Sequence, residues 1–239
     1  MANGIYSAAA GMAAQQTRLD AIANDLANNS TTGYKSERVA FADLVYTPED
    51  GVPVGSGVAT VNAGRSFSAG AFEDSNDPLS LAIDGPAFFQ VRRADGSPAL
   101  TRAGDFQLDE AGSLVTSAGE RLVPPVKVPK GTDPSEVTIS GDGSVSIKGK
   151  TIGKIDLVDV ASPDSLVAAG GSLYTTTTAS GAATLAKGSS LVQGQLESSN
   201  VDVADSMTEM MDAQQTYSLS SRALQIQDQL LQIANEIKR

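Results

Sequence analysis

The 239-residue sequence contains no cysteine, no histidine and no tryptophan. Without cysteine there is neither a disulfide nor a thiolate metal site. Without histidine, Ser-His-Asp and Cys-His nucleophilic catalysis are excluded, together with the common zinc sites. An enzyme would have to work with carboxylates, lysine, tyrosine and hydroxyl groups alone.

Long apolar runs are also missing, since no stretch approaches the roughly 18 residues that a membrane-spanning helix requires. The first residues, MANGIYSAAAGM, lack the basic segment and the leucine-rich segment of a secretory signal peptide. Aromatic residues make up only 5% of the chain, and they are scattered. A stacking platform for glycans or nucleic acid is therefore not expected.

The net charge is −11, and the acidic residues are spread along the chain rather than gathered in a tail. A surface of this kind disfavours nucleic acid and anionic membranes as partners. The adjacent carboxylates Asp109 and Glu110 lie beside a turn glycine, and the stretches 55–57 and 141–143 lack most of a phosphate-binding loop. We expect no catalytic residue, no metal, no cofactor and no small-molecule substrate.

The first strong pattern is an N-terminal helix over about residues 4–28, followed by the stop NNSTTG. Its apolar residues step by four and three, apart from one gap at Gln15, and this heptad spacing requires a partner helix. The seam residues are Ile5, Ala8, Met12, Leu19, Ile22 and Leu26.

A second helix is predicted over about residues 202–238. Its early seam (Val203, Met207 and Met210) is out of phase, around Tyr217, with a later one. The later seam consists of Leu219, Ala223, Ile226, Leu230, Ile233 and Ile237. We expect the N-terminal seam to pack against this later seam of the same chain and against the same helices in neighbouring copies.

Between the helices, short apolar stretches alternate with glycine turns from residue 71 to about 192, which is typical of an all-β meander, sandwich or small barrel. The predicted strands are Leu79–Ile83, Ala87–Arg92, Ala99–Arg102, Asp105–Leu108, Ser113–Thr116, Val123–Val128, Val137–Ile139, Ser144–Lys148 and Ile152–Val160. A single helical turn is expected after Ser162, and a short strand at Val58–Val61. The segment 34–46 is left open between an extended arm and a short helix.

The predicted fold class is α+β, with long N- and C-terminal helices that pair as a coiled coil and a central all-β domain. The predicted segments are 1–33 as the N-terminal helix of an inner core, 34–70 as an extended arm or connector, 71–195 as a β-rich outer domain, and 196–239 as the C-terminal helix of the core. Helices of this kind suit packing among many copies, and head-to-tail packing that does not close gives a helical filament.

Three blocks of the sequence resemble the bacterial flagellar rod and hook proteins. The first is ANDLAN at residues 23–28, followed by Thr31, Gly33, Tyr34 and Lys35. The second runs from LAIDGPAFFQV at 81–91 through Thr101-Arg102-x-Gly104-x-Phe106 to Gly119, and the third is GQLESSNV at 194–201 with Gln214-x-x-Tyr217. Asp25 departs from the pattern, because the family usually has asparagine there.

The resemblance implies a structural subunit of the flagellar basal-body rod, which assembles into a helical tubular shaft and transmits torque from the motor to the hook. It implies partners among copies of itself, the other rod and hook proteins and the flagellar type III export apparatus, with export that needs no cleavable signal. The localisation implied is the periplasmic rod of the basal body. The second and third blocks look slightly more like a distal than a proximal rod protein.

The residues expected at the subunit interface lie on the two helices and at the end of the first. They are Ile5, Met12, Leu19, Ile22, Asn24, Leu26, Asn28, Gly33, Tyr34, Met207, Met210, Tyr217, Leu219, Ile226, Leu230, Ile233 and Ile237. Two alternatives stay open: a hook or hook-junction component of the same axis, and a secreted β-domain enzyme or glycan binder on a coiled-coil stalk. The last would need a pocket lined by acids and aromatics within residues 71–192.

Overall fold

The computed structural model describes residues 2–44, 47–49, 52–54 and 57–237, without the side chains of 2–5, 47–49, 52–54, 231, 234, 235 and 237. The chain forms two compact units. The helical unit comprises Met1–Ala27, Glu37–Ala63 and Asp202–Arg239, and the β unit comprises Asn28–Ser36 and Gly64–Val201. None of the described helices combines the length and the apolarity needed to cross a membrane.

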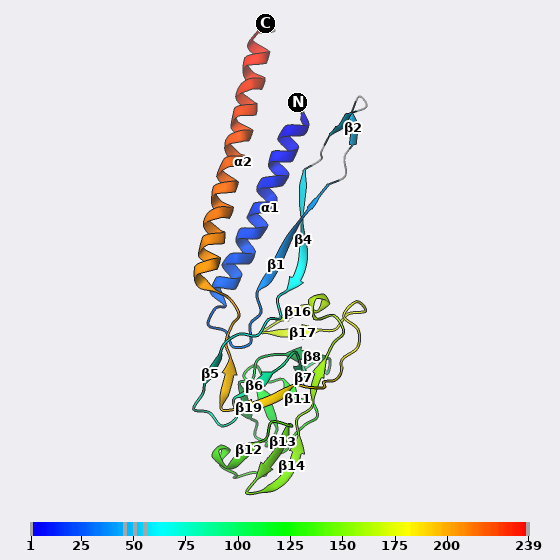
Figure 1. Cartoon of the computed structure of the whole chain (residues 1–239), viewed down its shortest axis with the longest axis vertical. Coiled ribbons are helices and arrows are strands. Elements are labelled where there is room, and N and C mark those ends of the chain that lie inside the picture. The colour runs from blue at the N-terminus through cyan, green and yellow to red at the C-terminus, as the bar shows by residue number, and fades with distance from the viewer. Residues whose placement is uncertain (1, 45–46, 50–51, 55–56, 238–239) are drawn as a thin grey trace. The chain divides into compact units, whose positions relative to one another are not determined.

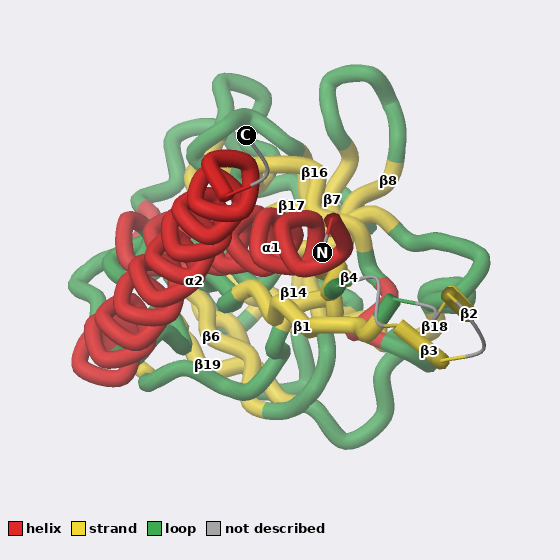
Figure 2. The backbone as a smooth tube through the Cα atoms, turned by 90° about the horizontal axis from the view of Figure 1, so that it is seen from above, coloured by secondary structure: helices red, strands yellow, loops and turns green. Residues whose placement is uncertain are grey.

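The helical unit contains two long helices, α1 (Ala2–Ala27) and α2 (Val203–Ile237). They lie side by side, as Figures 1 and 2 show, and this contact confirms the predicted pairing of the two ends of the chain. Asp202 caps α2, since its Oδ1 accepts hydrogen bonds from the amides of Ala204 (2.8 Å) and Asp205 (3.2 Å).

Extended backbone rather than a helix follows α1, which settles the choice left open for residues 34–44, while residues 45 and 46 lie outside the described ones. Strand β1 (Glu37–Asp43) pairs with β4 (Val58–Arg65) in a two-stranded ribbon, and β2 (Thr47–Glu49) pairs with β3 (Val52–Val54). The ribbon touches α1, because a Cβ on Gly57 would lie 3.0 Å from the Cβ of Ala10.

The β unit carries the remaining strands. They are β5 (Phe72–Asp74), β6 (Leu81–Asp84), β7 (Phe88–Arg92), β8 (Pro98–Thr101), β9 (Phe106–Leu108), β10 (Leu114–Thr116), β11 (Arg121–Leu122), β12 (Val137–Ile139), β13 (Ser144–Ile147), β14 (Lys150–Lys154), β15 (Leu157–Asp159), β16 (Val167–Gly170), β17 (Leu173–Thr175), β18 (Thr184–Leu185), β19 (Ser190–Gln193) and β20 (Gln195–Glu197). Single 3₁₀ turns occur at Pro134–Glu136 and at Pro163–Ser165, the second where the helical turn was predicted.

The largest sheet runs in the order β16-β17-β8-β7-β11-β10-β9, with β15 paired to β7 and β18 to β15. Strands β12, β13 and β14 form a separate sheet, while β6 pairs with β19 and β5 with β20. These pairings are antiparallel, which confirms the predicted all-β centre.

Two apolar clusters fill the β unit, and the adjacent residues Phe88 and Phe89 enter different ones because neighbouring side chains on a strand point to opposite faces. Phe89 meets the ring of Phe106 edge to face, with centroids 5.0 Å apart. Phe88 lies in the second cluster with Phe67 and Tyr174. The two adjacent phenylalanines thus pack into the apolar clusters on opposite faces of the main sheet.

Two of the predicted strands differ from the structure. The stretch Val123–Val128 contains no strand, and β11 ends at Leu122, because Pro124 and Pro125 offer no amide hydrogen for a ladder. The stretch Ile152–Val160 is divided between β14 and β15.

Tyr174 gives the β unit a measurable alkaline transition. Burial raises the pKa of Tyr174 from 10.0 to about 12. Between pH 10 and 12 the folded chain keeps the phenol proton of Tyr174 while the unfolded chain loses it. The contribution of Tyr174 to the free energy of unfolding is therefore complete below pH 10 and decreases between pH 10 and 12. At pH 11 the loss relative to pH 9 should be about 1.4 kcal/mol. Urea unfolding at pH 9 and pH 11 should show this loss of stability in the natural chain and not in Tyr174→Phe. An equal loss in the natural chain and in the variant would show that Tyr174 is not its source.

Candidate subunit interface

The contact between α1 and α2 is made by small side chains. Ala14 and Ala213 are buried, at 3% and 0% exposure. A Cβ on Gly11 would lie 3.9 Å from Ser220 Oγ. Ile22 is also buried, at 7%. The backbones can therefore approach closely, and most of the large apolar side chains of α2 that the structure describes stay exposed.

The two helices run antiparallel, because contacts that move forward along α1 move backward along α2. Gly11 faces Ser220, whereas Arg18 Nη2 lies 3.4 Å from Glu209 Oε2. In this register the last part of α2 extends past the start of α1, as Figure 1 shows. The Arg18–Glu209 pair is partly exposed, so we assign it at most about 1 kcal/mol.

An apolar stripe on α2 is left uncovered. It consists of Leu219, Ile226, Leu230 and Ile233, each between 52% and 58% exposed, and is called the α2 stripe below. At 3.6 residues per turn these positions share one face, roughly 120° from the face of Ala213 and Ser220 that meets α1. The expectation that this seam packs against α1 of the same chain is therefore wrong: α1 takes the small-residue face instead.

The other residues predicted for the interface fall into three groups. Ile22, Gly33 and Tyr34 are buried within the chain, so they can position an interface without offering a surface to a neighbour. Met12, Leu19, Leu26, Asn28 and Met210 are half-buried, whereas Asn24, Met207 and Tyr217 are exposed. The side chains of Ile5 and Ile237 lie outside the described ones.

Further apolar side chains are exposed near the stripe and on the ribbon. Met211 on α2 is exposed, and so are Phe41, Leu44 and Val61 on and beside β1 and β4. The interface predicted from sequence did not include Phe41, Leu44 and Val61. Heptad spacing could not have found the three on the ribbon, because they belong to extended backbone.

Asp25, which departs from the family pattern, is used inside the helical unit. Its carboxylate is buried and accepts the Glu37 amide at both oxygens, at 3.1 and 3.2 Å. The last turn of α1 is thereby tied to the start of β1. An acceptor oxygen is what this position requires, and either aspartate or asparagine supplies one.

A buried ion cluster joins the three family-like blocks within the β unit. Lys35 Nζ lies 2.6 Å from Glu197 Oε1, and both side chains are fully buried. Arg102 Nη1 lies 3.4 Å from Glu197 Oε2, and the guanidinium stacks 4.9 Å above the ring of Phe88. One carboxylate thus faces two cations, which come from positions 162 and 95 residues earlier in the chain.

Burial dominates the electrostatics of this cluster. It lowers the pKa of the Lys35 ammonium below its usual range, although the Glu197 carboxylate acts to raise it. Burial likewise lowers the pKa of Arg102. The cations are expensive to bury, so the cluster depends on the one carboxylate between them. The signal in the sequence was that each block contains one of these charges, but nothing local indicated that they are buried.

Glycines allow the blocks to meet. Gly33 has φ +65°, and a Cβ there would lie 2.5 Å from the Ala103 amide nitrogen. Its own amide donates to the Glu197 carbonyl at 2.8 Å. A Cβ on Gly104 would lie 1.6 Å from the Leu81 carbonyl oxygen. Any side chain at either position would push the segments apart.

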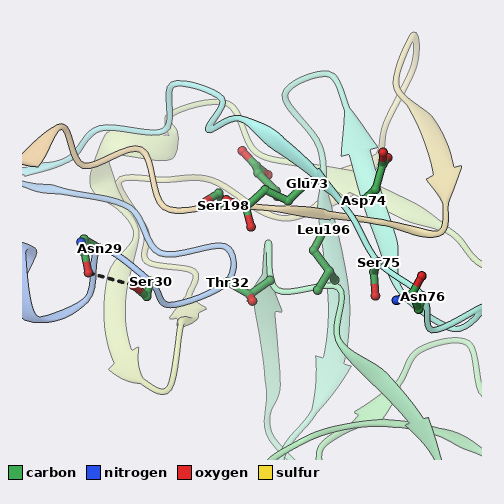
Figure 3. A pocket seen from close by; sticks show the side chains of 10 residues that line it. Asn29, Ser30, Thr32, Glu73, Asp74, Ser75, Asn76, Leu196 and Ser198 are labelled. Atoms are coloured by element: carbon green, nitrogen blue, oxygen red, sulfur yellow. Dashed lines mark hydrogen bonds between the residues drawn. The ribbon is translucent and has the colours of Figure 1, made fainter.

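A polar pocket of about 430 Å³ lies in the β unit (Figure 3). Its lining includes Glu73, Asp74 and Asn76, with Leu196 as its large apolar residue. A second cavity, of about 250 Å³, lies around Leu108 and Val128. No aromatic residue lines either pocket, unlike the mostly apolar and aromatic pockets of small-molecule sites. Among the described residues, no three carboxylates gather as metal ligands would.

Comparison with known families places the chain by all three blocks. Residues 5–35 match the profile "Flagella basal body rod protein", residues 82–147 match "Flagellar hook protein FlgE/F/G D1 domain", and residues 192–237 match "Flagellar basal body rod FlgEFG protein C-terminal". Together with the paired terminal helices and the central β unit, these matches define the class as an axial protein of the bacterial flagellum.

Full-length relatives narrow the class to the rod. The chain is 36% identical over 264 aligned residues to the flagellar basal-body rod protein FlgG of Borreliella burgdorferi, and 36% over 267 to that of Bacillus subtilis, with both chains covered completely in each case. It is 32% identical to FlgF of Caulobacter vibrioides, over 91% of this chain and 90% of the relative. The chain belongs to the flagellar basal-body rod protein family, a family of structural proteins rather than enzymes.

The ion cluster gives a sharp test of what holds the β unit together. Glu197→Gln preserves the shape of the side chain but leaves Lys35 and Arg102 buried without their anion, which should cost about 3–5 kcal/mol. Adding Lys35→Met should restore part of the loss, because one uncompensated cation is removed.

Urea unfolding followed by circular dichroism measures both effects. Glu110→Gln, on an exposed turn, is the matched control and should change stability by less than about 0.5 kcal/mol. If Glu197→Gln were as mild as this control, the β unit would not depend on the ion cluster for its stability.

Proposed function

We propose that the chain is a subunit of the distal part of the flagellar basal-body rod, and that its copies assemble into a helical tubular shaft that transmits torque from the motor to the hook. The observation that carries this proposal is the α2 stripe on a chain that belongs to the rod family. An apolar stripe that one subunit leaves uncovered is the expected mark of a surface that a neighbour covers.

The stripe is large enough to drive assembly. Burying one leucine or isoleucine side chain fully is worth about 1.5–3 kcal/mol. The four residues of the stripe are a little over half exposed, so about half of this gain remains for each of them on assembly. Part of this gain is offset by the entropy lost on association. Since each subunit in a helical shaft contacts several neighbours, modest contacts repeated along the shaft give a stiff structure.

The distal position is supported by the relatives named FlgG, which match over the whole chain at 36% identity, while the FlgF relative matches over 91%. The partners we propose are copies of the same chain, the other rod and hook proteins and the flagellar type III export apparatus. We also propose that α1 and α2 belong to the inner tube and residues 71–195 to the outer layer.

A hook or hook-junction position is the second candidate. It is favoured by the match of residues 82–147 to a profile that includes the hook protein. Immunogold electron microscopy of intact basal bodies separates the two, because label between the membrane rings supports the rod and label beyond the outer ring supports the hook.

Removing the stripe should abolish assembly without unfolding the chain. The variant Ile226→Ser, Leu230→Ser and Ile233→Ser changes three exposed side chains, so the thermal melting of the isolated chain should shift little. Cells that carry it should lack rods and should not spread in motility agar, because the neighbouring subunit loses its apolar contact.

The matched control changes Gln225, Gln229 and Gln232 to serine. These residues have the same spacing on the same helix and are also exposed, so the control reproduces the loss of helix propensity without the loss of apolar surface. Control cells should swim. Normal swimming by the stripe variant would contradict the proposed function.

A further inference from the structure

Three segments of the β unit continue in sequence into the helical unit. They are 28–36, which follows α1 and precedes β1, 64–70, which begins with the last two residues of β4, and 195–201, which precedes α2. Most of their residues lie outside regular strands, so their backbone groups need partners other than a sheet ladder.

Asn200, in the third segment, bonds to both of the others. Its Oδ1 accepts the Ser36 amide at 2.8 Å, and its Nδ2 donates to the Ser66 carbonyl at 2.8 Å and to Ser68 Oγ at 3.0 Å. Its own amide donates to the Tyr34 carbonyl at 3.4 Å. One asparagine side chain therefore bridges the three segments.

Glu197 repeats the arrangement three residues earlier. Its carbonyl accepts the Gly33 amide at 2.8 Å, and its Oε1 accepts both Lys35 Nζ at 2.6 Å and the Gly70 amide at 3.0 Å. The ion pair with Lys35 is thus one part of a connection that also reaches the 64–70 segment.

The first and second segments are also bonded directly to each other. The Ser66 amide donates to the Ser36 carbonyl at 2.9 Å, and Arg65 Nη1 donates to the Lys35 carbonyl at 2.6 Å. Lys35 Nζ donates to the Ser68 carbonyl at 2.7 Å. Each segment is therefore bonded to the other two, and Lys35 and Glu197 are shielded from water.

We propose that Glu197 and Asn200 form one cooperative clamp that closes the three segments linking the β unit to the helical unit, and that this linker clamp carries load in the working assembly. Force on any one segment is shared among bonds to the other two. Because the charged pair at its centre is excluded from water, water does not compete for these bonds as it does on a surface. The load-carrying part rests on the proposed function, whereas the clamp itself does not.

Hydrogen exchange measured by NMR on the isolated full chain tests the cooperativity. Asn200→Asp removes the Nδ2 donors that reach Ser66 and Ser68. In a cooperative clamp, exchange should accelerate at least tenfold at the amides of Gly33 and Gly70 too, although their partner is Glu197. The amides of β7 and β8 should keep their protection. Asn76→Asp, an exposed asparagine of the same unit, makes the same charge change and should alter none of these rates.

Two outcomes would overturn the clamp. Acceleration confined to Ser36 and Ser66 would mean that the contacts are independent of one another. Acceleration that includes β7 and β8 to the same degree would mean that Asn200 contributes only to general stability. Neither outcome depends on whether the chain builds a rod.

The load-carrying role is tested in cells that carry Asn200→Asp. Their flagella should form in normal number and drive swimming in dilute medium, but swimming should fail at a lower viscosity than with Asn76→Asp. Equal performance of the two variants at every viscosity would overturn this role. Loss of assembly by the stripe variant, which tests the proposed function, is a separate result.

Discussion

The small side chains between α1 and α2 set a constraint on the rest of the helical unit. Gly11, Ala14 and Ala213 let the helices lie close together, and so close an approach leaves little room for larger side chains. Four leucines and isoleucines of α2 lie elsewhere instead, and they gather as the α2 stripe on a face directed away from α1. In the proposed function, a neighbouring subunit covers that stripe. A helix pair that completed its own core would have no comparable reason to assemble.

In the β unit, three segments that lie mostly outside regular strands are held in place by side chains. Its strands satisfy their backbone groups in ladders, but most of the residues in the three segments that continue in sequence into the helical unit do not. Glu197 and Asn200 supply acceptors and donors there, and Lys35 and Arg102 make the glutamate indispensable. Burying these charges is costly, so the complete cluster adds little net stability. It matters because each cation would be left buried without an anion if the glutamate were removed. The same four residues lie within the blocks that identified the family.

Much of the fold could be predicted from the sequence, because its signals are local. Heptad spacing and the turn residues after Asn28 placed both helices to within two residues, and glycine turns marked most strands of the β unit. The face of α2 that meets α1 was missed, since the more apolar stripe was assumed to be the inner one. The ion cluster was missed because Lys35 and Glu197 are 162 residues apart, and burial of a charge leaves no trace in the residues beside it.

Whether the α2 stripe is a surface between copies of the chain can be seen in a cryo-electron microscopy map of the assembled rod, at a resolution that shows side chains. We expect Leu219, Ile226, Leu230 and Ile233 to be buried against helices of neighbouring subunits, while Ala213 still faces α1 of its own chain. A map in which these four side chains face solvent or the central channel would contradict this expectation.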